Sequence, residues 1–200
     1  MRPLSFRNKL VMARKVAMNF PQIETARLRL RPWRAEDVDD LHRLWTHPEV
    51  RRYLWDDLII TPEQAAEVIS SSLACFEEHG FGQWVISPKA EAAVIGFCGF
   101  RFFGDPPEVE ILYGVDPTHW GQGLATEAAR AVLRYGFEEP GLDRIYAGAD
   151  PPNTASFRVM EKAGLRFDKR TRVHHLEAIY YVISREAFRP ADPVYVLRRA

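Results

Sequence analysis

One sequence feature constrains the fold of this chain more than any other. It is a strand-like segment followed directly by a glycine-containing turn and then by a helix-forming segment. The apolar residues of Val109–Val115 favour a strand, Asp116-Pro117 favours a turn, and the Ala-, Glu- and Leu-rich residues from Leu124 onward favour a helix. The first N–H groups of a helix have no partner inside it, and the helix dipole adds partial positive charge there. Gly121 and Gly123 lack the Cβ atoms that would keep a phosphate away from the backbone. The sequence therefore predicts a binding site for a phosphate-bearing ligand at this turn.

Two other phosphate-binding loops do not match this segment. A P-loop ends in Gly-Lys-Ser or Gly-Lys-Thr, whereas Gly123 is followed by Leu124 and Ala125. The dinucleotide-binding pattern has a third glycine at the position that Thr126 occupies. Two glycines alone are also typical of a tight strand-to-helix turn that binds nothing, so the interpretation needs support from elsewhere in the chain.

Two further segments give that support. Arg144–Ala149 has the pattern of another strand, and Asp150–Phe167 follows it with an Asp-Pro-Pro-Asn turn and a second helix-forming run. Near the N-terminus, Glu24–Trp33 contains side chains that alternate as in a strand. Together with the glycine turn, these motifs resemble the GNAT family of N-acetyltransferases, and most closely the branch that includes the ribosomal-protein N-terminal acetyltransferases. The resemblance covers about residues 23–188 and implies that acetyl-CoA is the cosubstrate.

Length and composition permit one domain of this kind. The chain has 200 residues, of which 46% are hydrophobic, enough for a single substantial core. We expect one α+β (α/β) GNAT-like domain at residues 23–190, with a mostly antiparallel twisted sheet of about six to seven strands flanked by about four helices. Residues 1–22 are expected to form a flexible N-terminal extension, and residues 191–200 a C-terminal tail.

Local signals place several of the expected elements. Thr61 followed by Pro62 and Gln64 is the pattern of a helix N-terminus, and Gly80 suits the left-handed residue that ends a helix. Small residues on one side of the helix after the glycine turn would let it lie close to a sheet; they include Ala125, Ala128, Ala129 and Gly136. Further strands are expected at residues 81–87, 94–103, 165–173 and 176–183.

Charge and cysteine content exclude several other classes of protein. Lys+Arg and Asp+Glu number 27 each, so no overall basic field favours nucleic acid or an anionic membrane. No apolar run approaches the length of a membrane span. Cys75 and Cys98 lie in apolar segments without a redox or metal-binding motif, and the adjacent His174 and His175 would point to opposite faces of a strand. We therefore expect a cytoplasmic protein that binds no metal, no nucleic acid and no membrane.

The acetyl-CoA contacts fall mostly on backbone groups. The pyrophosphate needs N–H donors, which Gln122–Thr126 offer at the helix start. The resemblance assigns the pantetheine arm to main-chain groups of the strand before the loop, and it gives Asn153 a contact with the cosubstrate. Asn153 would alternatively cap the helix that follows it. By the same resemblance, Trp120 replaces a Gln or Arg that usually opens the loop. The expected acetyl-CoA-binding residues are Tyr113, Val115, Trp120, Gly121, Gln122, Gly123, Leu124, Ala125, Thr126, Asn153 and Ser156.

Acetyl transfer requires a neutral amine and a partner for the departing sulfur. Keeping a lysine side chain neutral at pH 7 costs roughly 4–5 kcal/mol, against about 1 kcal/mol for an α-amine, so a carboxylate acting through water can serve as the base. Glu110 is the predicted base, and Glu108, on the same face of the strand, is the reserve candidate. Ser156 is predicted to hydrogen-bond the sulfur, because Met160 stands where many relatives carry a proton-donating tyrosine.

The acceptor and one alternative function stay open. Residues 47–60 and 172–181 are expected to line the acceptor side, where they offer Arg51, Arg52, Trp55, Asp56, Asp57, His174 and Tyr180. These side chains suit a peptide N-terminus and a small-molecule amine equally well. Because position 160 lacks the family's tyrosine, the alternative function is that of a non-catalytic acyl-CoA-binding module with the same fold. A homodimer is compatible with the enzyme and with the binding module.

Overall fold

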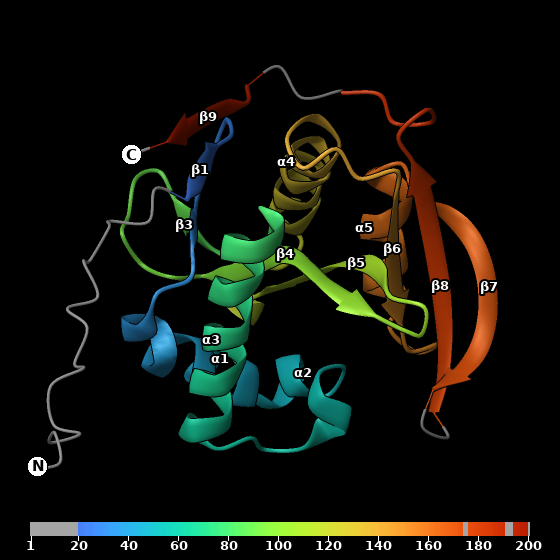
Figure 1. Cartoon of the computed structure of the whole chain (residues 1–200). Helices are drawn as coiled ribbons and strands as arrows, with labels where there is room; N and C mark the ends of the chain where they lie inside the picture. Colours follow the sequence, from blue (N-terminus) through green and yellow to red (C-terminus); the bar gives the residue numbers. More distant parts are fainter. Residues whose placement is uncertain (1–19, 174–175, 191–193, 200) are drawn as a thin grey trace, which may run out of the picture.

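The chain forms one mixed sheet flanked by helices. The computed structural model describes residues 20–173, 176–190 and 194–199 (Figure 1). In these ranges the α-helices are α1 (Val38–Thr46), α2 (Pro48–Arg51), α3 (Pro62–His79), α4 (Leu124–Glu138) and α5 (Thr154–Lys162), and the short 3-10 helices are η1 (Ala35–Asp37), η2 (Trp55–Asp57) and η3 (Pro117–His119). The strands are β1 (Pro21–Glu24), β2 (Leu28–Pro32), β3 (Gln83–Pro88), β4 (Gly96–Phe103), β5 (Glu108–Val115), β6 (Arg144–Ala149), β7 (Arg166–Val173), β8 (Leu176–Ser184) and β9 (Val196–Arg199).

The sheet is larger than the sequence predicts. Its nine strands have the order β7-β8-β6-β5-β4-β3-β2-β1-β9. The two strands beyond the expected six to seven are β1 and β9, which pair antiparallel from Pro21↔Arg199 to Glu24↔Val196. The ordered domain therefore begins before residue 23 and includes part of the expected C-terminal tail, whereas residues 1–19 of the predicted extension lie outside the described residues.

One strand pair differs from the rest in direction. The pairing of β5 with β6 is parallel, and its register joins Glu110 to Tyr146, while the other described pairs are antiparallel. Beyond this position β5 continues for five residues to Val115 and β6 for three to Ala149. From the Glu110–Tyr146 pair onward, β5 therefore leads to the glycine loop and β6 leads to α5.

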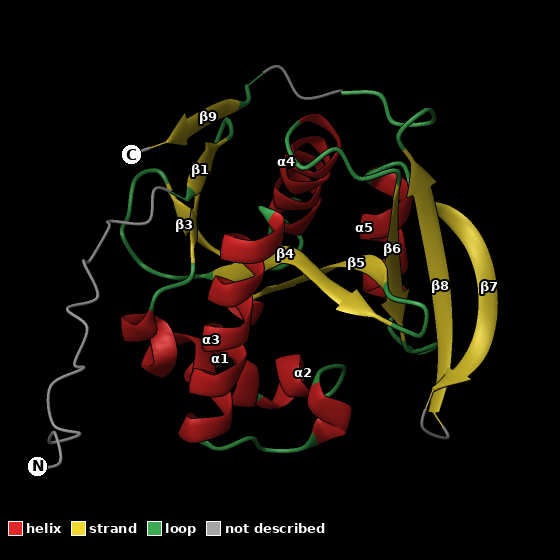
Figure 2. Ribbon diagram, viewed as in Figure 1, coloured by secondary structure: helices red, strands yellow, loops and turns green. Residues whose placement is uncertain are grey.

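Helices cover both faces of the sheet (Figures 1 and 2). One core cluster includes Phe100 and Ile111 from the sheet and Ala128 and Leu133 from α4. The other joins the opposite face to α1 and α3 through residues such as Trp45, Ile69 and Phe97. Because successive strand residues point to opposite faces, Tyr113 lies on the α4 face and Glu110 on the α1 face.

Local sequence signals explain where α3 and α4 lie. Thr61 and Gln64 form the predicted capping box, and Gly80 follows the helix with φ 75°. In α4, a Cβ at Gly136 would come within 2.7 Å of the Phe100 ring and 3.0 Å of Ile145. The small residues predicted on this side therefore do bring α4 close against β4 and β6.

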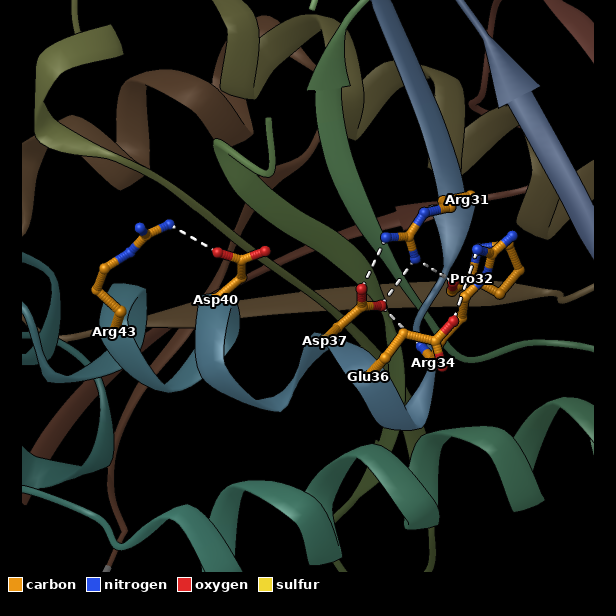
Figure 3. A network of polar contacts seen from close by, with 7 residues as sticks. All are labelled: Arg31, Pro32, Arg34, Glu36, Asp37, Asp40 and Arg43. Atoms are coloured by element: carbon orange, nitrogen blue, oxygen red, sulfur yellow. Dashed lines mark hydrogen bonds and ion pairs between the residues drawn. The ribbon is translucent and has the colours of Figure 1, made fainter. Parts of the chain in front are cut away.

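A partly buried ion pair between Arg31 and Asp37 holds the start of α1 against β2 (Figure 3). Both carboxylate oxygens of Asp37 accept from the Arg31 guanidinium at 2.7 Å, and the Arg34 N–H donates to Oδ2 at 2.8 Å. The hydrogen bonds to Asp37 raise the pKa of Arg31 against the opposing effect of its partial burial. Within the described ranges, no helix combines the length and apolarity needed to cross a bilayer.

Candidate functional site: a glycine loop and a strand junction

The glycine loop has the open geometry that the sequence predicts. Gly121 and Gly123 both have φ 76°, a left-handed conformation that glycine adopts without strain, and Gly123 is the N-cap of α4. A Cβ at Gly121 would meet nothing within 4 Å, and one at Gly123 would meet only Arg27 Nη2, at 3.8 Å. The first turn of α4 therefore faces open space, as an approaching anion requires.

Arg27, which lies in the turn between β1 and β2, contacts both the glycine loop and the first turn of α4. Its Nη1 donates to the Gln122 carbonyl at 2.9 Å, and its Nε donates to Glu127 Oε2 at 2.6 Å. Thr25 Oγ1 donates to Glu127 Oε1 at 2.6 Å. Burial raises the pKa of Glu127, but the hydrogen bonds from Thr25 and Arg27 outweigh it and hold the pKa below its ordinary value. The negative charge of Glu127 in the first turn of α4 is thus balanced by the positive charge of Arg27.

Sequence reasoning missed this role of Arg27 and Glu127. The two residues are 100 positions apart, and the sequence around Arg27 carries no local signal of a contact with Glu127. The same region forms an open hollow beside the loop, and its lining includes Arg27, Arg130 and Lys162. The lining also includes Glu127, whose negative charge Arg27 balances. Cationic side chains beside an exposed helix start suit a phosphate-bearing ligand.

Trp120 has a defined contact in the loop. Its indole is half exposed, and Nε1 donates to the Val115 carbonyl at 2.6 Å. This is one of the main-chain groups expected to hold the pantetheine arm. A carbonyl oxygen has two lone pairs, so the contact leaves it able to accept a second bond.

Tyr113 connects β5 to the first turn of α5. Its hydroxyl donates to the Ser156 carbonyl at 3.0 Å and lies 2.8 Å from Ser156 Oγ. Burial raises the pKa of Tyr113, with a smaller opposing effect of the Ser156 hydrogen bond, so the phenol stays neutral. The sequence predicts only a main-chain role for Tyr113. The contact between its side chain and Ser156 becomes visible only in the folded structure.

Asn153 and Met160 both have structural positions in α5. Asn153 Oδ1 accepts from the Ser156 N–H at 3.2 Å, which makes Asn153 the N-cap of the helix. This capping contact is the alternative role that the sequence leaves open for Asn153. Because it uses Oδ1, the side-chain NH2 group is the part of Asn153 that could make a further contact. Met160 is buried in the core.

Glu110 lies on the opposite face of the sheet, in an aromatic environment. Its side chain is 5% exposed, and Oε1 accepts from Arg101 Nε at 2.6 Å across the β4–β5 pair. Phe103 stacks on Tyr180 with a centroid separation of 5.4 Å and contacts Tyr146 edge-on at 5.6 Å. Burial and then the negative charge of Glu110 raise the pKa of Tyr180. Of the predicted acceptor-side residues, Tyr180 thus shares an aromatic cluster with Tyr146, the register partner of the predicted base.

A second acidic position lies at the end of β6. Strand alternation puts Asp150 on the same face as Tyr146, and burial and then the charge of Asp56 raise its pKa. Asp56 belongs to η2, where Trp55, Asp56 and Asp57 all have positive φ, and Asp57 is tied to Arg51 at 3.0 Å. The predicted acceptor-side residues Asp56 and Asp57 thus belong to η2, while His174 lies outside the described residues. Within the described part of the chain, no group of His, Cys, Asp and Glu side chains could hold a metal ion.

Comparison with known proteins decides the family. Residues 27–166 match the family model of the acetyltransferase (GNAT) domain. The chain belongs to the GNAT acetyltransferase family. Its fold is the single α+β GNAT domain, and it is an acetyl-CoA-dependent N-acetyltransferase.

Individual relatives agree with this assignment. The chain is 33% identical over 162 residues to the uncharacterized N-acetyltransferase p20 of Bacillus licheniformis, an alignment that covers 78% of this chain and 91% of p20. It is 26% identical over 142 residues to the spermidine N(1)-acetyltransferase of Escherichia coli, covering 68% and 72% of the two chains. The crystal structure of a GNAT acetyltransferase from Bacillus anthracis superposes with a TM-score of 0.71 at 27% identity, covering 82% of this chain and 99% of that one.

Proposed function

We propose that this GNAT enzyme transfers the acetyl group to a primary amine by direct attack in a ternary complex, at the junction of β5 and β6. The observation that carries the proposal is the placement of candidate groups on the two sides of that junction. Glu110 lies on the α1 face, and the Tyr113–Ser156 pair lies on the α4 face. A thioester lying between the two strands would have a carboxylate on one side and hydroxyl groups on the other.

Acetyl-CoA would bind from the α4 face. The backbone N–H groups of Gln122–Thr126 would receive the pyrophosphate at the α4 N-terminus, with Arg27 holding the loop in place. Main-chain groups of Tyr113 and Val115 would contact the pantetheine arm, which leads from the loop to the strand junction. Trp120 and Asn153 lie at the two ends of this path, at the loop and at the start of α5.

The acyl transfer then needs two proton movements. The amine nitrogen attacks the thioester carbon, a C–N bond forms, and the C–S bond breaks with its electron pair going to sulfur. Glu110, directly or through a water, takes the proton that the amine loses, and Glu108 is the reserve for this role. The Ser156 hydroxyl donates a hydrogen bond to the departing sulfur, which takes its proton from solvent.

The charges on the acceptor side favour a small cationic amine. Burial and then the negative charge of Asp56 raise the pKa of Asp150, and Tyr146, the register partner of Glu110, belongs to an aromatic cluster with Phe103 and Tyr180. Carboxylates and aromatic faces both attract ammonium groups. The spermidine acetyltransferase among the relatives acts on an amine of this kind by its name. A peptide N-terminus, which the resemblance to the ribosomal-protein branch suggests, is the competing acceptor.

A thiol-release assay tests the proposal. The protein is incubated with acetyl-CoA and, in separate pools, polyamines, aminoglycosides and peptides with free N-termini, and free CoA thiol is measured. Release with an amine pool supports transfer, and mass spectrometry of the divided pool identifies the acceptor. Release with peptides alone would contradict the small-amine proposal. Binding of acetyl-CoA without release in any pool would instead favour the non-catalytic module.

A further inference from the structure

The side chain of Tyr113 makes both of its polar contacts with one residue, Ser156, at distances of 3.0 Å to the carbonyl and 2.8 Å to Oγ. We propose that Tyr113 is a positioning residue that turns the Ser156 hydroxyl toward the CoA sulfur. This inference rests on the proposed role of Ser156. It gives Tyr113 a side-chain function in addition to the main-chain contact expected from its strand position.

The hydrogen-bond donors allow two arrangements of the pair. The phenol has one hydrogen, so when Tyr113 donates to the Ser156 carbonyl, the Ser156 hydroxyl donates to the Tyr113 oxygen. When the phenol donates to Ser156 Oγ instead, the serine hydrogen is free to point elsewhere. Because both acceptors belong to one residue, a rotation about the phenol C–O bond interconverts the two arrangements. A negative sulfur next to Ser156 would favour the second arrangement.

Burial keeps Tyr113 suited to this task. It raises the pKa of the phenol, so the group remains a neutral donor over the whole working pH range. Without that partner, a serine in the first turn of a helix can turn its hydroxyl to a nearby backbone carbonyl, which removes it from the sulfur. The N-cap bond from Asn153 to the Ser156 N–H fixes the backbone of the same residue. Asn153 thus holds Ser156 through its amide, and Tyr113 holds it through its carbonyl and its hydroxyl.

Met160 explains why a hydroxyl from another element is needed beside Ser156. Met160 is one helical turn after Ser156 on α5, and its side chain is buried in the core, so this position supplies no hydroxyl. Tyr113 brings a phenol to the same helix from β5. The buried phenol is a weaker acid than a thiol, so it acts by orienting Ser156 and not by giving up its own proton.

The experiment measures the thiol of bound CoA, so it needs no acceptor. The ultraviolet absorbance of the thiolate is titrated against pH for free CoA and for CoA bound to the wild type and to Tyr113→Phe, Ser156→Ala and the double variant. Thermal shift on CoA addition shows that each variant is folded and bound. Tyr135→Phe is the matched control, because it removes a hydroxyl that donates to the Gly80 carbonyl after α3 and contacts neither Ser156 nor Tyr113 by a hydrogen bond.

The wild type is expected to lower the thiol pKa relative to free CoA. Ser156→Ala should reduce the thiolate-to-thiol ratio at a fixed pH by about tenfold, the size of one hydrogen bond to a charged group. Tyr113→Phe should reproduce much of this loss, the double variant should match Ser156→Ala, and Ser156→Thr, which keeps the hydroxyl, should restore the ratio. Tyr135→Phe should match the wild type.

Other results would overturn the inference. A wild-type thiol pKa in Tyr113→Phe, or a double variant whose loss is the sum of the two single losses, would show that Tyr113 does not act through Ser156. In either case CoA binding would persist, and the proposed function would stand. A wild-type protein that does not bind CoA would contradict the proposed function and the inference together.

Discussion

Arg101 donates from its Nε to Oε1 of Glu110 at 2.6 Å, across a register pair of β4 and β5. The two side chains differ in exposure, since that of Arg101 is 58% exposed and that of Glu110 only 5%. The contact fixes the carboxylate on the α1 face of the sheet and engages one of its two oxygens. In the proposed mechanism, the other oxygen would receive the proton from the amine.

Glu110→Gln is expected to lower kcat by about 10²-fold or more, the usual size of a general-base contribution. Glutamine keeps a carbonyl oxygen for Arg101, so the fold and the acetyl-CoA affinity should change little. The effect should shrink as the pH rises toward the pKa of the acceptor amine, because solvent then supplies the neutral amine. The measurement is a pH profile of kcat with the acceptor found by thiol release.

Glu108→Gln is the matched control for this prediction. It makes the same chemical change two residues earlier on the same face of β5 and should leave kcat near the wild-type value. A loss at Glu108 with normal turnover in Glu110→Gln would move the role of base to Glu108. Normal turnover in both variants would remove the protein base from the mechanism.

Gly123→Asp is expected to abolish CoA binding. It places a negative charge at the N-cap of α4, where the pyrophosphate should bind. Gly123→Asn is the control, because asparagine has the same shape, tolerates the left-handed conformation at φ 76° and carries no charge. The readout is the CoA-dependent rise in melting temperature, which follows from binding to the native state alone. Equal binding by both folded variants would contradict the phosphate-loop assignment.

Elements with strong local signals could be predicted from the sequence. The capping box at Thr61, the left-handed Gly80 and the strand Arg144–Ala149 all lie where the sequence predicts them. Each of these features depends on residues within one turn or one strand. The glycine loop was predictable for the same reason, since its geometry follows from Gly121 and Gly123.

The contacts that complete the site depend on distant residues. Arg27 and Glu127 are separated by 100 positions, and Tyr113 and Ser156 by 43. No periodicity within a short window reports such pairs. The pairing of β1 with β9 was missed for the same reason, because a four-residue strand at the end of a chain is defined by its partner and not by its own pattern.

Asp37→Asn is expected to destabilise the fold by about 3–5 kcal/mol. It removes the charge that neutralises a partly buried Arg31 and breaks a two-fold contact, and loss of one partner of a buried pair carries a cost of this size. Asp40→Asn is the control seen in the same view (Figure 3), because its pair with Arg43 is exposed and should contribute at most about 1 kcal/mol. Urea unfolding of the two variants measures the difference. Similar losses would show that the Arg31–Asp37 pair does not anchor α1.

Glu127→Gln is expected to lower stability at neutral pH by about 1–2 kcal/mol, through loss of the charge that Arg27 contacts. Hydrogen bonds from Thr25 and Arg27 hold the pKa of Glu127 below its ordinary value of 4.5, so its contribution is complete above that pH. It is lost as the pH falls through the lower pKa of the folded state, because the carboxyl is then protonated in both states. The stability gap between wild type and variant should therefore close on acidification below about pH 4.5. Unfolding by urea at a series of pH values measures the gap, with Glu138→Gln, from an exposed pair with Arg134, as the control. A gap that persists unchanged at acid pH would show that the charge of Glu127 does not stabilise the glycine loop.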